Sequence, residues 1–193
     1  RVGNQCWMKE NVRSEHYLDG TPIAKGTEMM EDTTYRYFPD NDSSKVATFG
    51  YLYNWKAAMN GAKATEANPS GVQGVCPEGW HVSTYSEWKR LSDALYSTTA
   101  GYNLKSEKLW EEHPHTDGKG NYYGFSAIPA GVRNAARQSV GIGTDAYIWT
   151  SREYDEERAY HAYLYYAWAD LFIPEGPKNS AMSVRCVKNN GTS

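Results

Sequence analysis

The sequence lacks the features that mark several large classes of protein. No stretch approaches the roughly 18 consecutive apolar residues of a membrane-spanning helix, so we expect no transmembrane segment. No run of Lys and Arg exceeds two adjacent residues, and 20 basic against 23 acidic side chains give a net charge of −3. Nucleic-acid-binding domains normally carry a basic stripe. The charge pattern therefore predicts no nucleic-acid partner.

Patterns that would indicate catalysis are also missing. No Gly-x-Ser-x-Gly turn around a nucleophilic serine occurs. Cys6, Cys76 and Cys186 stand far apart, without the Cys-x-x-Cys pair of a zinc ribbon or a thiol oxidoreductase. Three cysteines allow one bridge and one leftover thiol, and all three pairings stay open at this point. No catalytic residue is predicted.

One polar loop is a weak candidate for a metal site. His113 and His115 alternate with a proline, and Asp117 and Asn121 follow. Oxygen ligands of this kind suit a hard cation such as Ca²⁺, but a zinc-type site needs three or four converging ligands. A solvated loop is the favoured interpretation. We predict no metal ligand and no cofactor, with a structural Ca²⁺ as the alternative.

Phenylalanine is scarce, with 4 residues against 16 Tyr and 7 Trp. Phe would serve core packing alone, whereas Tyr and Trp are enriched where a ring is half buried and its polar end is wet. Tyr-rich surfaces recur in binding loops because the ring gives contact area at low entropic cost. Two interpretations stay open, a binding surface and ordinary packing in a loop-rich core.

The organisation along the chain indicates one α+β domain over residues 1–193. No internal repeat or low-complexity tract occurs, and the helix signals come early while the strand signals come late. The chain starts at Arg1 without a Met or a signal-like segment. We interpret it as a trimmed fragment of a longer secreted or lipoprotein precursor.

Two helices are predicted. Apolar residues at helical spacing indicate a helix over 51–59. Thr84 and Glu87 form a capping-box pattern, which predicts a helix over 85–96.

Four strands are predicted, over 124–129, 146–151, 159–168 and 183–188. In the third of these, alternation places His161, Tyr163 and Tyr165 on one face. The opposite face receives Tyr160, Ala162, Leu164, Tyr166 and Trp168.

Five segments, in order, resemble one family. They are GNQCWMKEN at 3–11, GYLYNW at 50–55, GVCPEGWHV at 74–82, GFSAIPAG at 124–131 and SVRCV at 183–187. Together they resemble the Fibrobacter succinogenes major paralogous domain, a family of surface lipoproteins and secreted proteins found mainly in Bacteroidetes. The resemblance covers essentially the whole chain.

Two segments also resemble the formylglycine-generating-enzyme-like branch of the C-type lectin fold. WHVSTYSEW at 80–88 is similar to the start of that branch's helix, and SVRCV at 183–187 is similar to its closing strand. The resemblance implies a C-type-lectin-like fold, with two main helices packed on small twisted antiparallel sheets and long loops. The oxidases of that branch need two neighbouring cysteines, which are missing, as are the calcium-dependent sugar-binding motifs of lectins. The expectation is therefore a protein that is not an enzyme.

The resemblance also implies a disulfide. A bridge between Cys76 and Cys186 would tie the loop before the second helix to the last strand. Cys6 remains the alternative partner. A bridge implies an oxidising compartment, so we expect an extracytoplasmic protein, on the cell surface or secreted, with a lipid anchor in its precursor.

C-type-lectin-like folds present the region before the last strand as a recognition face, which here is 149–180. Rings that stack on a sugar or peptide, beside Arg and Asp side chains that fix its orientation, make a plausible binding surface. The predicted ligand-binding residues are Arg152, Tyr154, His161, Tyr163, Tyr165, Trp168 and Asp170.

The leading hypothesis is a non-catalytic ligand-binding or adhesive module of the bacterial cell surface that recognises a glycan or a protein. The alternative is a structural or assembly domain of a surface or fimbrial protein, with the aromatic face buried against a neighbour. An enzyme is the third and least favoured hypothesis, because a fold alone permits many chemistries.

Overall fold

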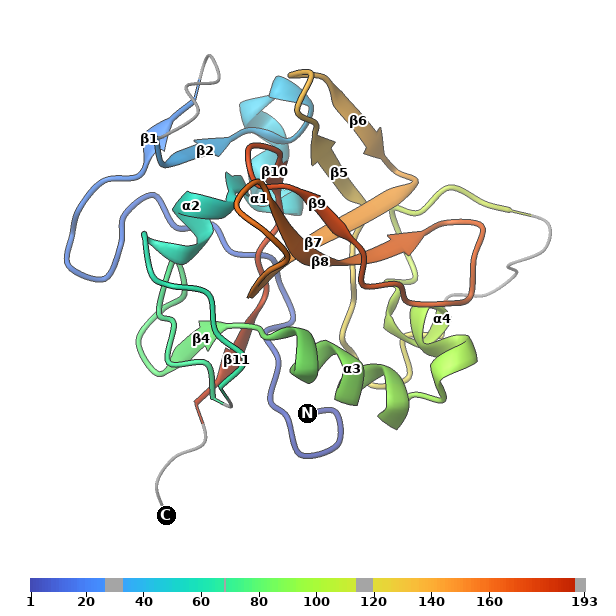
Figure 1. Ribbon diagram of the computed structural model, residues 1–193. Helices are drawn as coiled ribbons and strands as arrows, with labels where there is room; N and C mark the ends of the chain where they lie inside the picture. Colours follow the sequence, from blue (N-terminus) through green and yellow to red (C-terminus); the bar gives the residue numbers. More distant parts are fainter. Residues whose placement is uncertain (27–32, 68, 114–119, 190–193) are drawn as a thin grey trace.

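The computed structural model describes residues 1–26, 33–67, 69–113 and 120–189 (Figure 1). Their main feature is a nine-stranded mixed sheet, ordered β1-β2-β3-β10-β5-β7-β8-β9, with β6 paired to β5. Strands β4 and β11 form a separate antiparallel pair. The strands are β1 (Ala24–Lys25), β2 (Tyr35–Tyr37), β3 (Leu52–Asn54), β4 (Trp80–Val82), β5 (Ala130–Arg133), β6 (Ser139–Ile142), β7 (Asp145–Glu153), β8 (Arg158–Tyr165), β9 (Glu175–Pro177), β10 (Ala181–Met182) and β11 (Cys186–Lys188).

The helices are short, which confirms an α+β mixture but differs from the expected pair of main helices. Only α3 reaches ten residues among the described helices. They are η1 (Pro39–Asn41), η2 (Ser43–Lys45), α1 (Val46–Phe49), α2 (Trp55–Met59), α3 (Tyr85–Ala94), η3 (Ser97–Thr99) and α4 (Ala100–Leu104). None of the helices in the described ranges is both long and apolar enough to cross a bilayer.

The capping box at α3 is confirmed. The Thr84 side chain accepts from the Glu87 backbone N–H, and the Glu87 carboxylate accepts from the Thr84 backbone N–H. Two backbone donors that the first helical turn leaves unpaired are satisfied in this way. The helix therefore begins where the sequence predicts, although it ends at Ala94.

The prediction of one helix over 51–59 is wrong in its first half. Residues 52–54 form the buried strand β3, which pairs with β2 and β10. The Asn54 side chain then accepts from the Ala57 backbone N–H, so it caps a helix that starts at Trp55. The apolar spacing of Leu52, Trp55 and Met59 fits both arrangements, because all three are buried.

The later strand predictions need boundary corrections. No strand spans 124–129; Ala127 makes an isolated bridge to Lys105, and β5 begins at Ala130. Strand β8 ends at Tyr165, where the chain turns and the Trp168 backbone N–H donates to the Tyr165 carbonyl. Trp168 therefore lies outside the strand, and the alternation rule does not place its side chain.

The β7–β8 pair divides the sheet into two faces. Antiparallel register places Asp145 opposite Tyr165, Tyr147 opposite Tyr163, and Trp149 opposite His161, so these six side chains share one face. The other face carries Ala146, Ile148, Ala162 and Leu164, which pack with α3 and α4 in one core cluster. Figure 1 shows α3 and α4 together on one side of the β7–β8 pair.

The disulfide joins Cys76 to Cys186, as the resemblance implies, and Cys6 is free and exposed. It connects the loop before β4 to the strand that pairs with β4. The bridge closes a loop of 110 residues, and in the chain-entropy model such a loop contributes on the order of 4–5 kcal/mol. A disulfide is consistent with an extracytoplasmic location.

Candidate functional site

The open part of the β7–β8 face carries a connected row of rings, which we call the aromatic ladder: Tyr147, Tyr163, Tyr165, Trp168 and Phe172. Centroid distances between successive rings are 4.8, 6.5, 4.9 and 5.4 Å. Trp168 is 47% exposed and Phe172 is 43% exposed, whereas Tyr147, Tyr163 and Tyr165 are half buried. The ladder thus runs from the sheet out to two rings in solvent.

Asp145 fixes the inner end of the ladder. Its carboxylate accepts a hydrogen bond from the Tyr163 hydroxyl at 2.6 Å, and it also accepts from the Thr144 hydroxyl. Burial and the Asp145 charge raise the pKa of Tyr147 to about 12 and raise the pKa of Tyr163 further. Both hydroxyls therefore stay protonated at neutral pH and act as hydrogen-bonding groups rather than as bases.

Lys105 holds the outer end of the ladder from behind. Its ammonium group donates to the carbonyls of Tyr165 and Trp168 at 2.6 and 2.7 Å, and a longer contact reaches the Tyr166 carbonyl. The Lys105 side chain is buried and lies over the Trp110 ring. A buried ammonium bonded to successive carbonyls fixes the turn that presents Trp168.

Helix α4 supports the same turn. The Tyr102 backbone N–H donates to the Ala169 carbonyl, and Gly101 packs so closely on Asp170 that a Cβ there would lie 2.2 Å from the Asp170 carbonyl oxygen. Asp170 was predicted to orient a ligand by its carboxylate. In the structure its backbone packs on α4, and its side chain is half buried.

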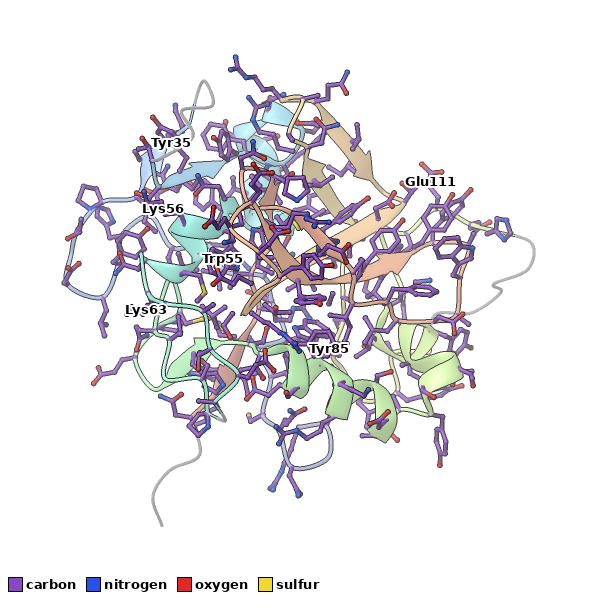
Figure 2. The ribbon with its side chains drawn as sticks, viewed as in Figure 1. Tyr35, Trp55, Lys56, Lys63, Tyr85 and Glu111 are labelled. Carbon is purple, nitrogen blue, oxygen red and sulfur yellow. A yellow bond between two sulfur atoms is a disulfide. The ribbon has the colours of Figure 1, made fainter. Side chains whose placement is uncertain are left out.

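Arg152 and Tyr154 lie apart from the ladder, on the α3 side of the sheet. The Arg152 guanidinium sits 4.9 Å from the centre of the Tyr85 ring and 5.0 Å from that of Tyr160, and Tyr154 packs edge-on against Tyr160. Figure 2 places Tyr85 at the start of α3. The predicted residues are therefore two groups on opposite faces, and the structure does not bring them together.

His161 is not on the open surface either. It is 4% exposed, and its ring packs against Trp149 and Tyr147. Burial lowers the pKa of His161 to about 4, against a smaller opposing contribution from a hydrogen bond with the Ala159 backbone. The imidazole is therefore neutral at pH 7. Alternation places His161 on the ladder face correctly, but it does not reveal that β9 and β10 cover this part of the face.

A groove lies beside the covered end of the ladder, with a volume of about 450 Å³. Tyr147 and Tyr163 line it, so the ladder and the groove are continuous. His161 forms part of its wall, together with Gly176 and Pro177 of β9. Small-molecule sites commonly have volumes of about 300–1,000 Å³.

A second cleft, of about 630 Å³, lies on the other side of Pro177, between α2 and the β7–β8 turn. Trp55 and Lys56, labelled in Figure 2, contribute to its wall. The Lys178 ammonium lies 4.7 Å from the centre of the Trp55 ring and binds the Glu153 carboxylate at 2.7 Å. A ligand could stack on Trp55 only by displacing this lysine, so the ladder is the more accessible aromatic surface.

The weak metal candidate receives no support from the described residues. His115 and Asp117 lie outside them, His113 packs edge-on against the Tyr166 ring, and the Asn121 side chain binds Ser126. Within the parts of the chain that the structure describes, no group of three or more His, Cys, Asp or Glu side chains is placed to hold a metal ion.

The sequence model of the Fibrobacter succinogenes major domain matches residues 1–188. The chain belongs to this family. No curated protein and no solved structure matches the sequence.

Several segments that carry the family resemblance meet at one buried residue of this Fibrobacter succinogenes major domain. The Arg185 guanidinium donates to the Asn11 side chain and to the carbonyls of Phe125 and Ser126. Asn11 in turn donates to the Phe49 carbonyl and to the Ser183 hydroxyl. We call Asn11, Phe125, Ser126, Ser183 and Arg185 the Arg185 frame. It joins the first, fourth and fifth resembling segments to the end of α1.

Sequence reasoning missed four residues that build the site. Asp145 directly precedes the strand predicted over 146–151, and Tyr147 lies within that strand. Alternation along 145–149 is the signal that could have placed both beside Trp149. Phe172 follows the turn and has no periodicity to mark it. Lys105 reads as an ordinary solvated lysine in the sequence, and only the tertiary structure shows the carbonyls that it binds.

Proposed function

We propose that this domain is a non-catalytic ligand-binding module that recognises a glycan or a protein through the aromatic ladder. The observation that carries the proposal is the pair of half-exposed outer rings, Trp168 and Phe172, held over a turn that Lys105 fixes. Exposed aromatic side chains on a rigid support supply contact area at little entropic cost. The ladder also lies in the region before the last strand, where the resemblance places a recognition face.

The proposal includes a C-type-lectin-like fold and a position on the cell surface or in the secreted fraction, with a lipid anchor in the precursor. Support for the fold comes from the small sheet, where the strand before α3 pairs with the closing strand. The disulfide that joins Cys76 to Cys186 supports the location. No reaction is part of the proposal, because the Asp145 carboxylate beneath the ladder already accepts hydrogen bonds from Thr144 and Tyr163.

Broad glycan and peptide arrays test this proposal. The wild-type protein should be retained by at least one class of ligand, and Trp168→Ala should weaken that retention by about tenfold or more, as expected when a central aromatic contact is removed. Tyr154→Ala is the matched control, because Tyr154 is 50% exposed but lies on the opposite face. Equal losses for both variants, or no retained ligand on any array, would contradict the proposal.

An assembly domain remains the second candidate, because the same two exposed rings would suit burial against another protein subunit. Sedimentation velocity over a wide concentration range separates the two. Self-association that Trp168→Ala abolishes and Tyr154→Ala preserves would favour assembly over ligand binding.

A further inference from the structure

Three carboxylates flank the aromatic ladder without a cationic partner. Asp145 lies beneath its inner end, Glu111 lies beside the turn between β6 and β7, and Asp170 lies in the turn between the two exposed rings. Among the described residues, no Lys or Arg side chain forms an ion pair with any of the three. The surface therefore carries negative charge that the chain does not neutralise by pairing.

Glu111 lies at the end of the ladder that Tyr165 occupies. Its backbone N–H donates to the Gly143 carbonyl, and a Cβ on Gly143 would lie 3.4 Å from a Glu111 carboxylate oxygen. Figure 2 shows Glu111 where β7 begins, which is the end of the sheet at which Tyr165 ends β8. Burial, Tyr166 and the charges of Asp145 and Glu111 raise the pKa of Tyr165. The exposed Glu111 carboxylate thus acts on the ladder from its solvent side.

The lysines in the segment before Glu111 do not neutralise this surface. Lys105 is buried behind the ladder, and its ammonium donates to backbone carbonyls. Lys108 is exposed and forms no ion pair with Glu111, Asp145 or Asp170. One buried ammonium is therefore outnumbered by three carboxylates, and a ligand that approaches from solvent meets the rings and the Glu111 charge.

Elsewhere the chain combines tyrosine rings and carboxylates with one of its own arginines. In three clusters a guanidinium lies 4.4 to 4.9 Å from the centre of a tyrosine ring and pairs with a carboxylate. The clusters are Arg36 with Tyr51 and Glu15, Arg152 with Tyr85 and Glu66, and Arg158 with Tyr154 and Asp155. The ladder has the rings and the carboxylates of these clusters, but no described arginine lies over its rings.

This combination selects the charge of a partner. The face of an aromatic ring attracts a cation, and a neighbouring carboxylate strengthens that attraction. An anionic partner would be repelled, whereas an uncharged sugar would gain nothing from the carboxylate charges. Arginine suits the surface better than lysine, because its planar guanidinium stacks on a ring and can bind a carboxylate through two parallel hydrogen bonds.

We infer that the ladder binds a protein segment that supplies an arginine side chain, stacked in the corner between the Tyr165 and Trp168 rings and balanced in charge by Glu111 and Asp170. The two rings meet at 64° with their centres 4.9 Å apart, so both can contact one guanidinium. This inference rests on the proposed function and deepens it, since it assigns the ligand of the ladder to basic proteins rather than to glycans.

The test uses two peptides of equal length, in which Gly-Ser repeats separate either arginines or citrullines. Citrulline keeps the planar shape of the arginine side chain and removes its charge. The probes are titrated at low salt into protein carrying ¹⁵N-labelled tryptophan. We expect the arginine peptide to shift the Trp168 indole signal saturably, and the citrulline peptide to bind about tenfold more weakly or worse. Raising the salt concentration should weaken binding of the arginine peptide alone.

Two matched variants locate the charge. Glu111→Gln should lower the affinity for the arginine peptide by about threefold or more, as expected for one exposed ion pair. Glu157→Gln removes the same charge from the wall of the cleft beside α2 and should leave the affinity unchanged. Both residues are exposed, and melting curves check that both variants are folded.

The outcomes separate this inference from the proposed function. If the arginine peptide leaves the Trp168 signal unmoved, if citrulline binds equally well, or if Glu111→Gln and Glu157→Gln have equal effects, the inference is wrong. An uncharged array ligand that needs Trp168 and is insensitive to Glu111→Gln would overturn the inference and leave the proposed function standing. If no ligand of any charge depends on Trp168, both are wrong.

Discussion

The Arg185 frame and the groove beside the aromatic ladder both contain a buried nitrogen base, and they differ in how it is satisfied. Arg185 is fully buried, yet it donates to a side-chain oxygen and to two carbonyls. His161 is almost as deeply buried, and its Nδ1 atom has no partner among the described residues. The burial of a polar group is thus compensated by hydrogen bonds in the frame and is left uncompensated at His161 Nδ1.

The family resemblance falls on the first of these regions. The resembling segments supply every member of the Arg185 frame and both cysteines of the disulfide. The ladder residues, from 147 to 172, lie outside all five segments. The segments that carry the resemblance therefore map onto the scaffold, whereas the proposed binding residues lie between the fourth and fifth segments, within the 1–188 range that the family model matches.

The largest expected effect tests whether the scaffold depends on its covalent link. Replacing both Cys76 and Cys186 by Ser should lower the free energy of unfolding by up to about 4–5 kcal/mol, because the unfolded chain regains the freedom of a long loop. Urea denaturation of oxidised protein measures this. Cys6→Ser is the control, since Cys6 is free and exposed, and a comparable loss in that variant would mean that the bridge is not the cause.

Replacing a tryptophan by alanine should reduce stability at one position and ligand binding at another. Trp88 belongs to α3 and its side chain is fully buried in the core, so Trp88→Ala should cost about 3–5 kcal/mol of stability. Trp168→Ala should cost about 1 kcal/mol or less and should instead reduce ligand binding. Denaturation and array binding of the two variants check this, and a Trp168→Ala protein as unstable as Trp88→Ala would mean that the ladder is part of the core.

His161 and His81, both buried, should give opposite pH dependences of stability. The pKa of His161 falls to about 4 on folding, below the value of roughly 6.5 in an unfolded chain. The unfolded state therefore takes up the proton first, and stability should decrease by up to about 3 kcal/mol as the pH falls from 6.5 to 4. His161→Phe should remove this decrease, which denaturation curves across that range would show.

His81 should behave in the opposite sense. Burial alone would lower its pKa, but the hydrogen bond and charge of Glu87, with a further hydrogen bond to Asn189, raise it above the usual value. Its stabilising contribution is fully present below about pH 6.5 and is lost as the pH rises through the raised pKa. His81→Gln should flatten that loss. If His81→Gln and His161→Phe altered the pH profile in the same direction, the assigned environments would be wrong.

The smallest effect concerns the support of the ladder. Lys105→Met keeps most of the side-chain length but leaves the carbonyls of Tyr165 and Trp168 without their charged donor. The expected cost is about 1–3 kcal/mol of stability, with weaker binding of any ligand that contacts Trp168. Lys108→Met, a nearby exposed lysine, should change neither quantity, and unchanged binding in Lys105→Met would show that the turn needs no support from behind.

Local signals in the sequence were sufficient where one side chain decides the outcome. The Thr84–Glu87 box fixed the start of α3, and the resemblance identified the bridged cysteines. The site was harder to predict, because its parts depend on which surfaces other elements cover. Alternation in β8 gave the correct faces for His161 and Tyr163, but burial of His161 depends on β9 and β10, which lie later in the chain.

The predicted ligand-binding residues fall on two faces of the sheet, and part of the cause is local and invisible to periodicity. A register shift between Trp149 and Glu153 interrupts the backbone pairing of β7 with β8. Arg152 and Tyr154 lie beside this shift, on the α3 side of the sheet. The turn after Tyr165 moves Trp168 to the ladder instead. Both departures depend on backbone irregularities that do not alter the pattern of apolar residues.

Selective oxidation of tryptophan, mapped by mass spectrometry in the free protein and in its complex with an array-selected ligand, tests the central claim most directly. The account predicts that Trp168 reacts far faster than the buried Trp88 and Trp149 in the free protein, and that the ligand protects it. A Trp168 that resists oxidation in the free protein, or that reacts equally fast in the complex, would contradict an exposed aromatic ladder as the binding surface.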